Sequence, residues 1–139
     1  AALEIVMGLK QGCPYSPLLY SLVFDRVAQV VAEAASSSTQ HGGQFVQLLT
    51  LQILILMFAD NVVLLALTLE GLALSFRAFS GFCQQHQMTI SQAKTKAFAI
   101  RHPEPLPALC LGDSSYEVVQ HFKYLGLHLD YQGSAAAIA

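Results

Sequence analysis

The sequence has little charge, and no surplus of basic residues. Charged residues make up 12% of the chain and the net charge is −2, whereas nucleic-acid-binding domains usually carry a basic surplus. This balance argues mildly against independent affinity for nucleic acid. Hydrophobic residues reach 54%, which is unusually apolar for a free-standing soluble protein. We therefore interpret the chain as an interior part of a larger protein, with surface that neighbouring parts would cover.

Cysteine is scarce and odd in number, and the N-terminal residues carry no leader pattern. The three cysteines, Cys13, Cys83 and Cys110, are widely separated, which excludes a disulfide scaffold and fits reduced thiols in an intracellular protein. The chain begins without Met, without a basic region and without a cleavage pattern, so we expect no signal peptide. The expected location is intracellular, cytoplasmic or nuclear, with no disulfide partner.

Long hydrophobic runs are present, and one of them contains a charge. Two apolar arms, 48–58 and 62–69, flank Asp60 and Asn61. An Asp-Asn tip is typical of a hairpin turn, because both residues tolerate positive φ. Since the arms lack strict alternation of apolar and polar residues, both of their faces are expected to be buried. Such a hairpin would hold one carboxylate at its apex.

Three interpretations of this run remain open from its pattern alone. The hairpin can be an ordinary one whose Asp only makes the turn, or it can present a catalytic carboxylate. Residues 45–69 are also long enough to cross a bilayer. Against a span, a central Asp costs roughly 2.5 to 3.5 kcal/mol on insertion scales, and no Lys or Arg closely flanks the run. We expect no membrane association, and a small membrane protein is the weakest alternative.

The remaining pattern predicts an α+β domain with a mostly antiparallel sheet. Ser16 followed by Pro17 is typical of a helix start. Apolar residues, among them Val23, Val27 and Val31, then recur at helical spacing to about residue 35. The later elements are a helix over about 70–86, a strand over 96–101, a hairpin about Gly112-Asp113 and a strand over 122–129. We predict one domain over 1–130 and an unstructured tail over 131–139.

Four short segments of the sequence stand out together. They are Gln11-Gly12-Cys13-Pro14-Tyr15-Ser16-Pro17, Phe58-Ala59-Asp60-Asn61, Ser91-Gln92-Ala93-Lys94-Thr95-Lys96 and Lys123-Tyr124-Leu125-Gly126. In this order they resemble the Q-G-x-x-x-S-P motif, the F/Y-A-D-D turn, the N-x-x-K-T-K segment and the K-Y-L-G primer-grip segment of reverse transcriptases, especially those of non-LTR (LINE-type) retrotransposons. Each motif alone is a weak signal, but all four occur in the family's order, over about residues 5–130. The resemblance implies the second half of a palm and the start of a thumb. Such a fragment is α+β, with an antiparallel sheet and a catalytic-turn hairpin packed on two helices.

The resemblance also assigns a role to each segment. It implies template-directed nucleotidyl transfer from dNTPs to a DNA primer, usually on an RNA template, with Mg²⁺ as cofactor. Asp60 would be a metal ligand, because Mg²⁺ prefers carboxylate oxygens, and Lys94 would neutralise or protonate the leaving group. From the residues alone, Lys94 could equally be a solvated surface lysine, and Gly12 a turn glycine. The other implied residues are Gln11, Gly12, Phe58 and Ala59 at the nucleotide, and Tyr124, Leu125 and Gly126 at the primer end.

Two departures from the family pattern matter. The second aspartate of the turn is replaced by Asn61, which keeps an oxygen acceptor but has no charge. The family's other metal-binding aspartate lies on a strand upstream of the Q-G segment, and Asp25, which follows that segment, is not its equivalent. We therefore expect a fragment that lacks the upstream fingers and palm region and is inactive alone. The alternative is a decayed or co-opted, non-catalytic palm domain that binds nucleic acid or protein.

Overall fold

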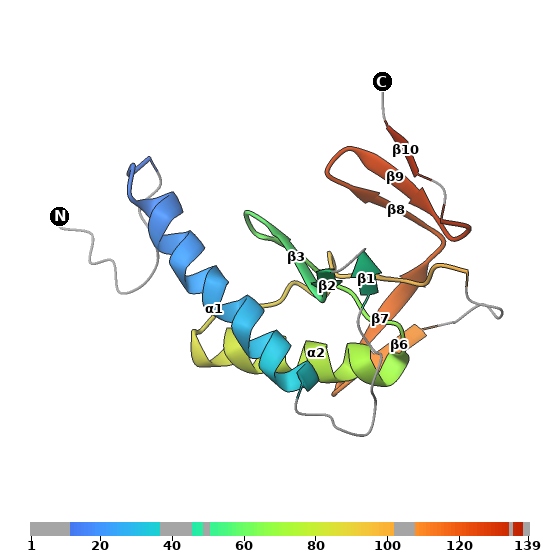
Figure 1. Cartoon of the computed structure of the whole chain (residues 1–139), viewed down its shortest axis with the longest axis horizontal. Coiled ribbons are helices and arrows are strands. Elements are labelled where there is room, and N and C mark those ends of the chain that lie inside the picture. Colours follow the sequence, from blue (N-terminus) through green and yellow to red (C-terminus); the bar gives the residue numbers. More distant parts are fainter. Residues whose placement is uncertain (1–11, 37–45, 49–50, 102–107, 134, 138–139) are drawn as a thin grey trace. The chain divides into compact units, whose positions relative to one another are not determined.

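Where the structure describes the chain, it consists of two helices and short strands that are mostly antiparallel, as the sequence predicted. The computed structural model describes residues 12–36, 46–48, 51–101, 108–133 and 135–137 (Figure 1). The chain divides into two compact units, Ala1–Phe82 and Cys83–Ala139. The fold class is α+β.

The first helix of the first unit, α1, spans Ser16–Ser36. The carbonyl of Tyr15 accepts the N–H of Leu19, so the helical hydrogen bonds begin one residue earlier than a Ser16 N-cap would give. Val27 and Val31 are completely buried and lie one turn apart on the same face. Val23, which was predicted to share that face, is 42% exposed. The buried stripe of α1 is therefore narrower than its sequence periodicity indicates.

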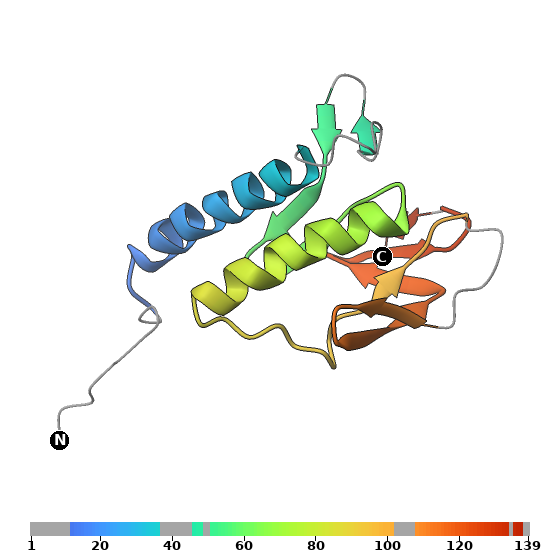
Figure 2. The same cartoon turned by 90° about the horizontal axis from the view of Figure 1, so that it is seen from below.

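The apolar run forms two small hairpins instead of one long hairpin. Strand β1 (Val46–Leu48) pairs with β2 (Leu51–Ile53), and β3 (Ile55–Phe58) pairs with β4 (Asn61–Leu64). In Figure 2 the teal strands β1 and β2 lie at the top of the view, apart from the green strand β3. The prediction of 48–58 as one arm of a single hairpin is therefore wrong. The first half of this segment contains β2, which pairs with the preceding strand β1, and only its second half, β3, pairs with the following strand β4.

The faces of the β3–β4 hairpin also differ from the prediction. Along β3 the side chains alternate between half-buried and exposed, with Leu56 40% and Phe58 59% exposed. This period of two is typical of a strand with one solvent-facing side, so the expectation that both faces are buried is wrong for β3. In β4 the successive residues Val62, Val63 and Leu64 are all half-buried. Among the described residues, no helix is long and apolar enough to cross a membrane.

The second helix, α2, spans Leu69–Gln85 and has a well-formed cap at each end. At its start, the hydroxyl of Thr68 accepts the backbone N–H of Gly71 at 3.1 Å. At its end, the N–H of Met88 donates to the carbonyl of Cys83, and Gln87 adopts a positive φ of 55°. These are a side-chain N-cap and a Schellman C-cap. The predicted limits of 70–86 are confirmed to within one residue.

We expect Thr68→Ala to lower the free energy of unfolding by about 1 kcal/mol, since the N–H of Gly71 would lose its acceptor. Thr68→Ser keeps the hydroxyl and is the matched control, with a smaller expected change. Denaturant unfolding followed by circular dichroism measures both. Equal losses in the two variants would show that the hydroxyl contributes nothing as a cap.

The second unit contains two three-stranded sheets. In one, β5 (Ala97–Phe98) runs parallel to β7 (Ser114–Val119), and β7 pairs antiparallel with β6 (Ala108–Leu111). The hairpin predicted about Gly112-Asp113 is confirmed, with Gly112 at a φ of 62°. The strand predicted over 96–101 is shorter than expected, because only β5 pairs with a neighbour.

The other sheet has the order β10-β9-β8. Strands β8 (His121–Tyr124) and β9 (Leu127–Asp130) form a hairpin, so the single strand predicted over 122–129 is wrong. The segment 131–139, predicted to be unstructured, contributes β10 (Ala135–Ala137), which pairs with β9. A turn with Gly133 at a φ of 85° reverses the chain before β10, and glycine adopts such angles without steric cost.

The three cysteines are free and lie in different environments. Cys83 is buried, and desolvation raises the pKa of its thiol above the ordinary value of 9.0, whereas Cys110 is exposed. In the unfolded chain the Cys83 thiol ionises first as pH rises, so the folded state binds more protons in that range. The stabilisation from the neutral thiol is therefore complete below pH 9 and is lost as pH rises through the higher folded pKa.

We expect the free energy of unfolding to fall above pH 9 with a contribution from Cys83 of at most about 1.4 kcal/mol per pH unit. Cys83→Ala should remove that slope, and Cys110→Ala, at an exposed position, is the matched control that should keep it. Unfolding titrations between pH 7 and pH 10 measure the slopes. An unchanged slope in Cys83→Ala would contradict this assignment.

Candidate functional site

The tip of the β3–β4 hairpin is a two-residue turn made by Ala59 and Asp60. Phe58 pairs with Asn61, so Asn61 is the first residue of β4 and does not belong to the tip. Ala59 takes the positive φ, 50°. The prediction of an Asp60-Asn61 tip is therefore shifted by one residue, because the strand register places Asn61 in the ladder. The register leaves the Asp60 carboxylate at the apex, as predicted, and Asp60 is exposed.

Helix α1 contacts this tip through an aromatic residue. The hydroxyl of Tyr20 donates a hydrogen bond to the carbonyl oxygen of Ala59, with an oxygen–oxygen distance of 2.7 Å. The ring of Tyr20 stacks on that of Phe24, with centroids 4.1 Å apart and planes inclined by 24°. Residues 39 apart in sequence are thus joined at the turn that carries Asp60.

An open pocket of about 900 Å³ lies between the start of α1 and the hairpin tip. One wall is the loop that leads into α1, including Gly12 at a φ of 79°. Another wall is the tip itself, with Ala59 and Asp60. Gly12, which was predicted to lie at the nucleotide, and Asp60, which was predicted to bind the metal ion, thus line one pocket. Gln11 lies outside the described residues.

Phe58 does not pack beneath the turn. Its side chain is 59% exposed and is absent from the pocket lining. In the alternating pattern of β3, Phe58 lies on the solvent-facing side with Leu56. Phe58, which the resemblance implied at the nucleotide, is therefore not among the residues that line this pocket, because its place in the strand register directs it outward.

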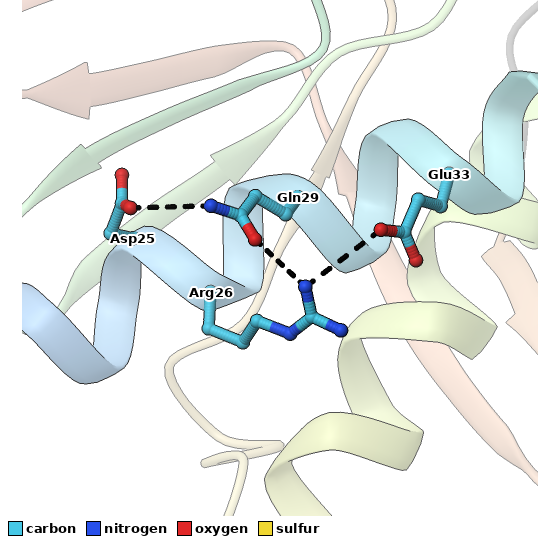
Figure 3. Close-up of polar contacts among 4 residues, drawn as sticks. All are labelled: Asp25, Arg26, Gln29 and Glu33. Carbon is cyan, nitrogen blue, oxygen red and sulfur yellow. Dashed lines mark hydrogen bonds and ion pairs between the residues drawn. The ribbon is translucent and has the colours of Figure 1, made fainter.

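Asp25 also lines the pocket, although the sequence gave no reason to select it. Figure 3 shows its carboxylate on α1, where it accepts a hydrogen bond from the amide of Gln29 at 3.4 Å. Gln29 in turn accepts one from Arg26 at 2.8 Å, and Arg26 lies 3.8 Å from the carboxylate of Glu33. Among the described residues, two carboxylates therefore lie on the pocket walls, Asp25 from α1 and Asp60 from the hairpin.

The other proposed site residues belong to the second unit. Lys94 is exposed and lies in the turn after α2, where its N–H donates to the carbonyl of Ser91. Leu125 and Gly126 form the turn of the β8–β9 hairpin, with φ of 48° and 86°. Tyr124 ends β8, half-buried, and its ring stacks on Phe122 with centroids 6.5 Å apart. These residues lie in turns and at a strand end, and the side chains of Lys94 and Leu125 are exposed.

The comparison with known families decides what these elements belong to. Residues 2–129 match the family described as "Reverse transcriptase (RNA-dependent DNA polymerase)". The chain belongs to the reverse transcriptase family. This confirms the resemblance that the four motifs indicated, at the level of the family. No solved structure shows a significant match to the chain.

A metal site in this reverse transcriptase chain would require a suitable set of ligands. Two-metal nucleotidyl transfer needs several hard oxygen ligands in a small volume. Among the described residues, no group of three or more His, Cys, Asp or Glu side chains is arranged to hold a metal ion. The hairpin tip supplies the carboxylate of Asp60, and the neighbouring Asn61 supplies a neutral amide. The described residues do not fit a two-metal site.

Sequence reasoning missed Tyr20 and Asp25 as members of the site of this reverse transcriptase chain. The position of Tyr20 fits the helical spacing of the apolar residues in 16–35, so the sequence pattern indicates only a place on the core face of the helix. Nothing local to either residue signals the contact, because the hairpin tip is about 40 residues away along the chain. The only available signal was their place just after the Q-G segment, whose loop forms a wall of the same pocket.

Proposed function

We propose that this chain is the later part of the palm, with the start of the thumb, of a non-LTR retrotransposon type of reverse transcriptase. The complete enzyme would synthesise DNA from dNTPs on a primer, usually with RNA as the template. The observation that carries this proposal is the Asp60 carboxylate, exposed at a hairpin tip beside an open pocket whose other wall is the Gly12 loop. The order of the four motifs along the chain supports the subtype.

The proposal includes a division of the catalytic groups between this chain and a region upstream of it. Asp60 would contribute one carboxylate, and the upstream palm strand of the family would contribute the other. Mg²⁺ would then be the cofactor of the complete enzyme, held jointly. Support comes from the donor set of the described residues, which does not suffice by itself. Lys94 would act on the triphosphate, and Tyr124, Leu125 and Gly126 on the primer end. The work of such an enzyme would take place in the cytoplasm or nucleus.

The test begins with the natural transcript upstream of Ala1. We expect an in-frame strand with an aspartate ahead of Gly8, and primer extension by a protein that includes it. In that longer protein, Asp60→Ala should reduce extension by about a thousandfold or more. Asp113→Ala is the matched control, because Asp113 is an exposed turn aspartate of the β6–β7 hairpin, and its loss should leave the rate unchanged.

A stop codon or an unrelated sequence upstream would contradict the polymerase proposal. The second candidate function, a non-catalytic domain that binds nucleic acid, is favoured by one observation. Asn61 is exposed and uncharged at the position of the second aspartate. A binding module should hold a primer–template duplex without Mg²⁺, with affinity that falls steeply as salt rises. Filter binding of the isolated chain between 50 and 200 mM salt distinguishes this function from simple decay.

A further inference from the structure

We propose that the hydroxyl of Tyr20 is a positioning group for Asp60, because it holds the peptide unit that leads into this residue. The carbonyl oxygen of Ala59, which accepts the Tyr20 hydroxyl at 2.7 Å, and the N–H of Asp60 belong to the same planar peptide. A hydrogen bond that holds this carbonyl oxygen also holds the orientation of the peptide plane. The direction in which the Asp60 side chain leaves the backbone is then restrained as well. The importance of Asp60 for catalysis rests on the proposed function, whereas the restraint on the turn does not.

The turn needs such a restraint, because its backbone is in a disfavoured conformation. Ala59 has a φ of 50°, a region where the Cβ of an L-residue crowds the following carbonyl. The last cross-strand pair of the hairpin is Phe58 with Asn61, so the ladder supplies no pair at the tip itself. Strained residues persist when their surroundings hold them. The hydrogen bond from the Tyr20 hydroxyl holds the backbone of Ala59 in this conformation from outside the hairpin.

The Tyr20 ring is itself well placed to act as a rigid arm. It lies on α1 one turn before Phe24, and the two rings stack at 4.1 Å. The same helix is anchored further along by the completely buried Val27 and Val31. A phenylalanine at position 20 would preserve the ring and its stacking but would lack the donor. The Tyr20→Phe substitution therefore removes the hydroxyl contact with Ala59 and leaves the aromatic ring in place.

The sequence offers a spectroscopic test that observes only this peptide. The dipeptide Ala-Asp occurs once in the chain, at Ala59-Asp60. Full-length chain labelled with ¹³C-carbonyl alanine and ¹⁵N aspartate therefore gives a single correlation peak between an alanine carbonyl and an aspartate amide. The amides of the other aspartates, Asp25, Asp113 and Asp130, report in the same sample whether the rest of the chain is unchanged.

We expect Tyr20→Phe to shift or split the Ala59–Asp60 peak while the peaks of Asp113 and Asp130 stay in place. The matched control is Tyr15→Phe, which removes a hydroxyl from a side chain that is 70% exposed near the same loop and should leave the peak unmoved. An unmoved peak in Tyr20→Phe would overturn the proposal. Loss of all aspartate peaks in Tyr20→Phe would also overturn it, since the hydroxyl would then support the whole fold.

This readout needs no nucleotide, metal or template. If the longer protein proves inactive but the peak of Tyr20→Phe shifts as expected, the polymerase proposal fails and the positioning role stands. If the longer protein is active and the peak does not shift, the positioning role fails alone.

Discussion

The isolated chain is expected to incorporate no dNTP on a primer–template above the level of a protein-free blank. The physical reason is charge. An in-line phosphoryl transfer stabilised by two divalent cations needs several carboxylates to hold them, and the hairpin tip supplies only Asp60, with neutral Asn61 beside it. Asp25 lines the same pocket, but its carboxylate accepts a hydrogen bond from Gln29 on its own helix. Gel-based primer extension with Mg²⁺ and labelled primer measures the activity.

The matched control for this assay is Asp60→Ala in the same isolated chain. Both proteins should be indistinguishable from the blank. If the incomplete metal site supports no primer extension, removal of one of its ligands cannot lower the activity further. Extension by the wild-type chain that disappears in Asp60→Ala would overturn the expectation. It would mean that the described carboxylates, or groups outside the described residues, complete the site within these 139 residues.

The second large effect is expected on stability, at the centre of α1. Val27 is completely buried, so Val27→Asp would place a carboxylate out of water. An uncompensated buried charge destabilises a fold by about 3 to 5 kcal/mol, which is a large part of the total stability of a small domain. We expect Val27→Asp to lose most of its cooperative unfolding transition at 25 °C, measured by circular dichroism in denaturant.

The control for this experiment lies one helical turn away. Val23 is 42% exposed, so the carboxylate in Val23→Asp can stay hydrated, and we expect a loss of about 1 kcal/mol or less. Helix propensity and net charge change identically in the two variants. Equal losses would mean that the buried stripe of α1 includes Val23, as the sequence periodicity predicted and the structure contradicts.

The two positions show what periodicity can predict and what it cannot. Val23 and Val27 are the same residue type at helical spacing, and the sequence assigns both to the core. Burial, however, depends on whether another part of the chain covers a given turn of the helix. The residues that cover a helix are distant in sequence. The apolar pattern of the helix itself therefore contains no information about which of its turns are covered.

The hairpin at Asp60 shows, for strands, the same difference between what the sequence pattern predicts and what the tertiary structure decides. The Asp-Asn pair favoured a turn at Asp60-Asn61, but the register pairs Phe58 with Asn61 and places the tip at Ala59-Asp60. A shift of one residue reverses the direction of every side chain, and Phe58 accordingly points outward. Turn propensity is a preference of about 1 kcal/mol, which the pairing and packing of whole strands can override.

By itself, the sequence determined the elements whose signals are local. These are the extents of α1 and α2, the Gly112-Asp113 turn, the α+β class and the order of motifs that identifies the family. The tertiary structure decided the strand registers, the pairing of β10 with β9 and the meeting of Tyr20 with Ala59. Local signals come from backbone preferences and capping within a few residues. Register and contact depend on partners tens of residues away, whose positions only the folded chain defines.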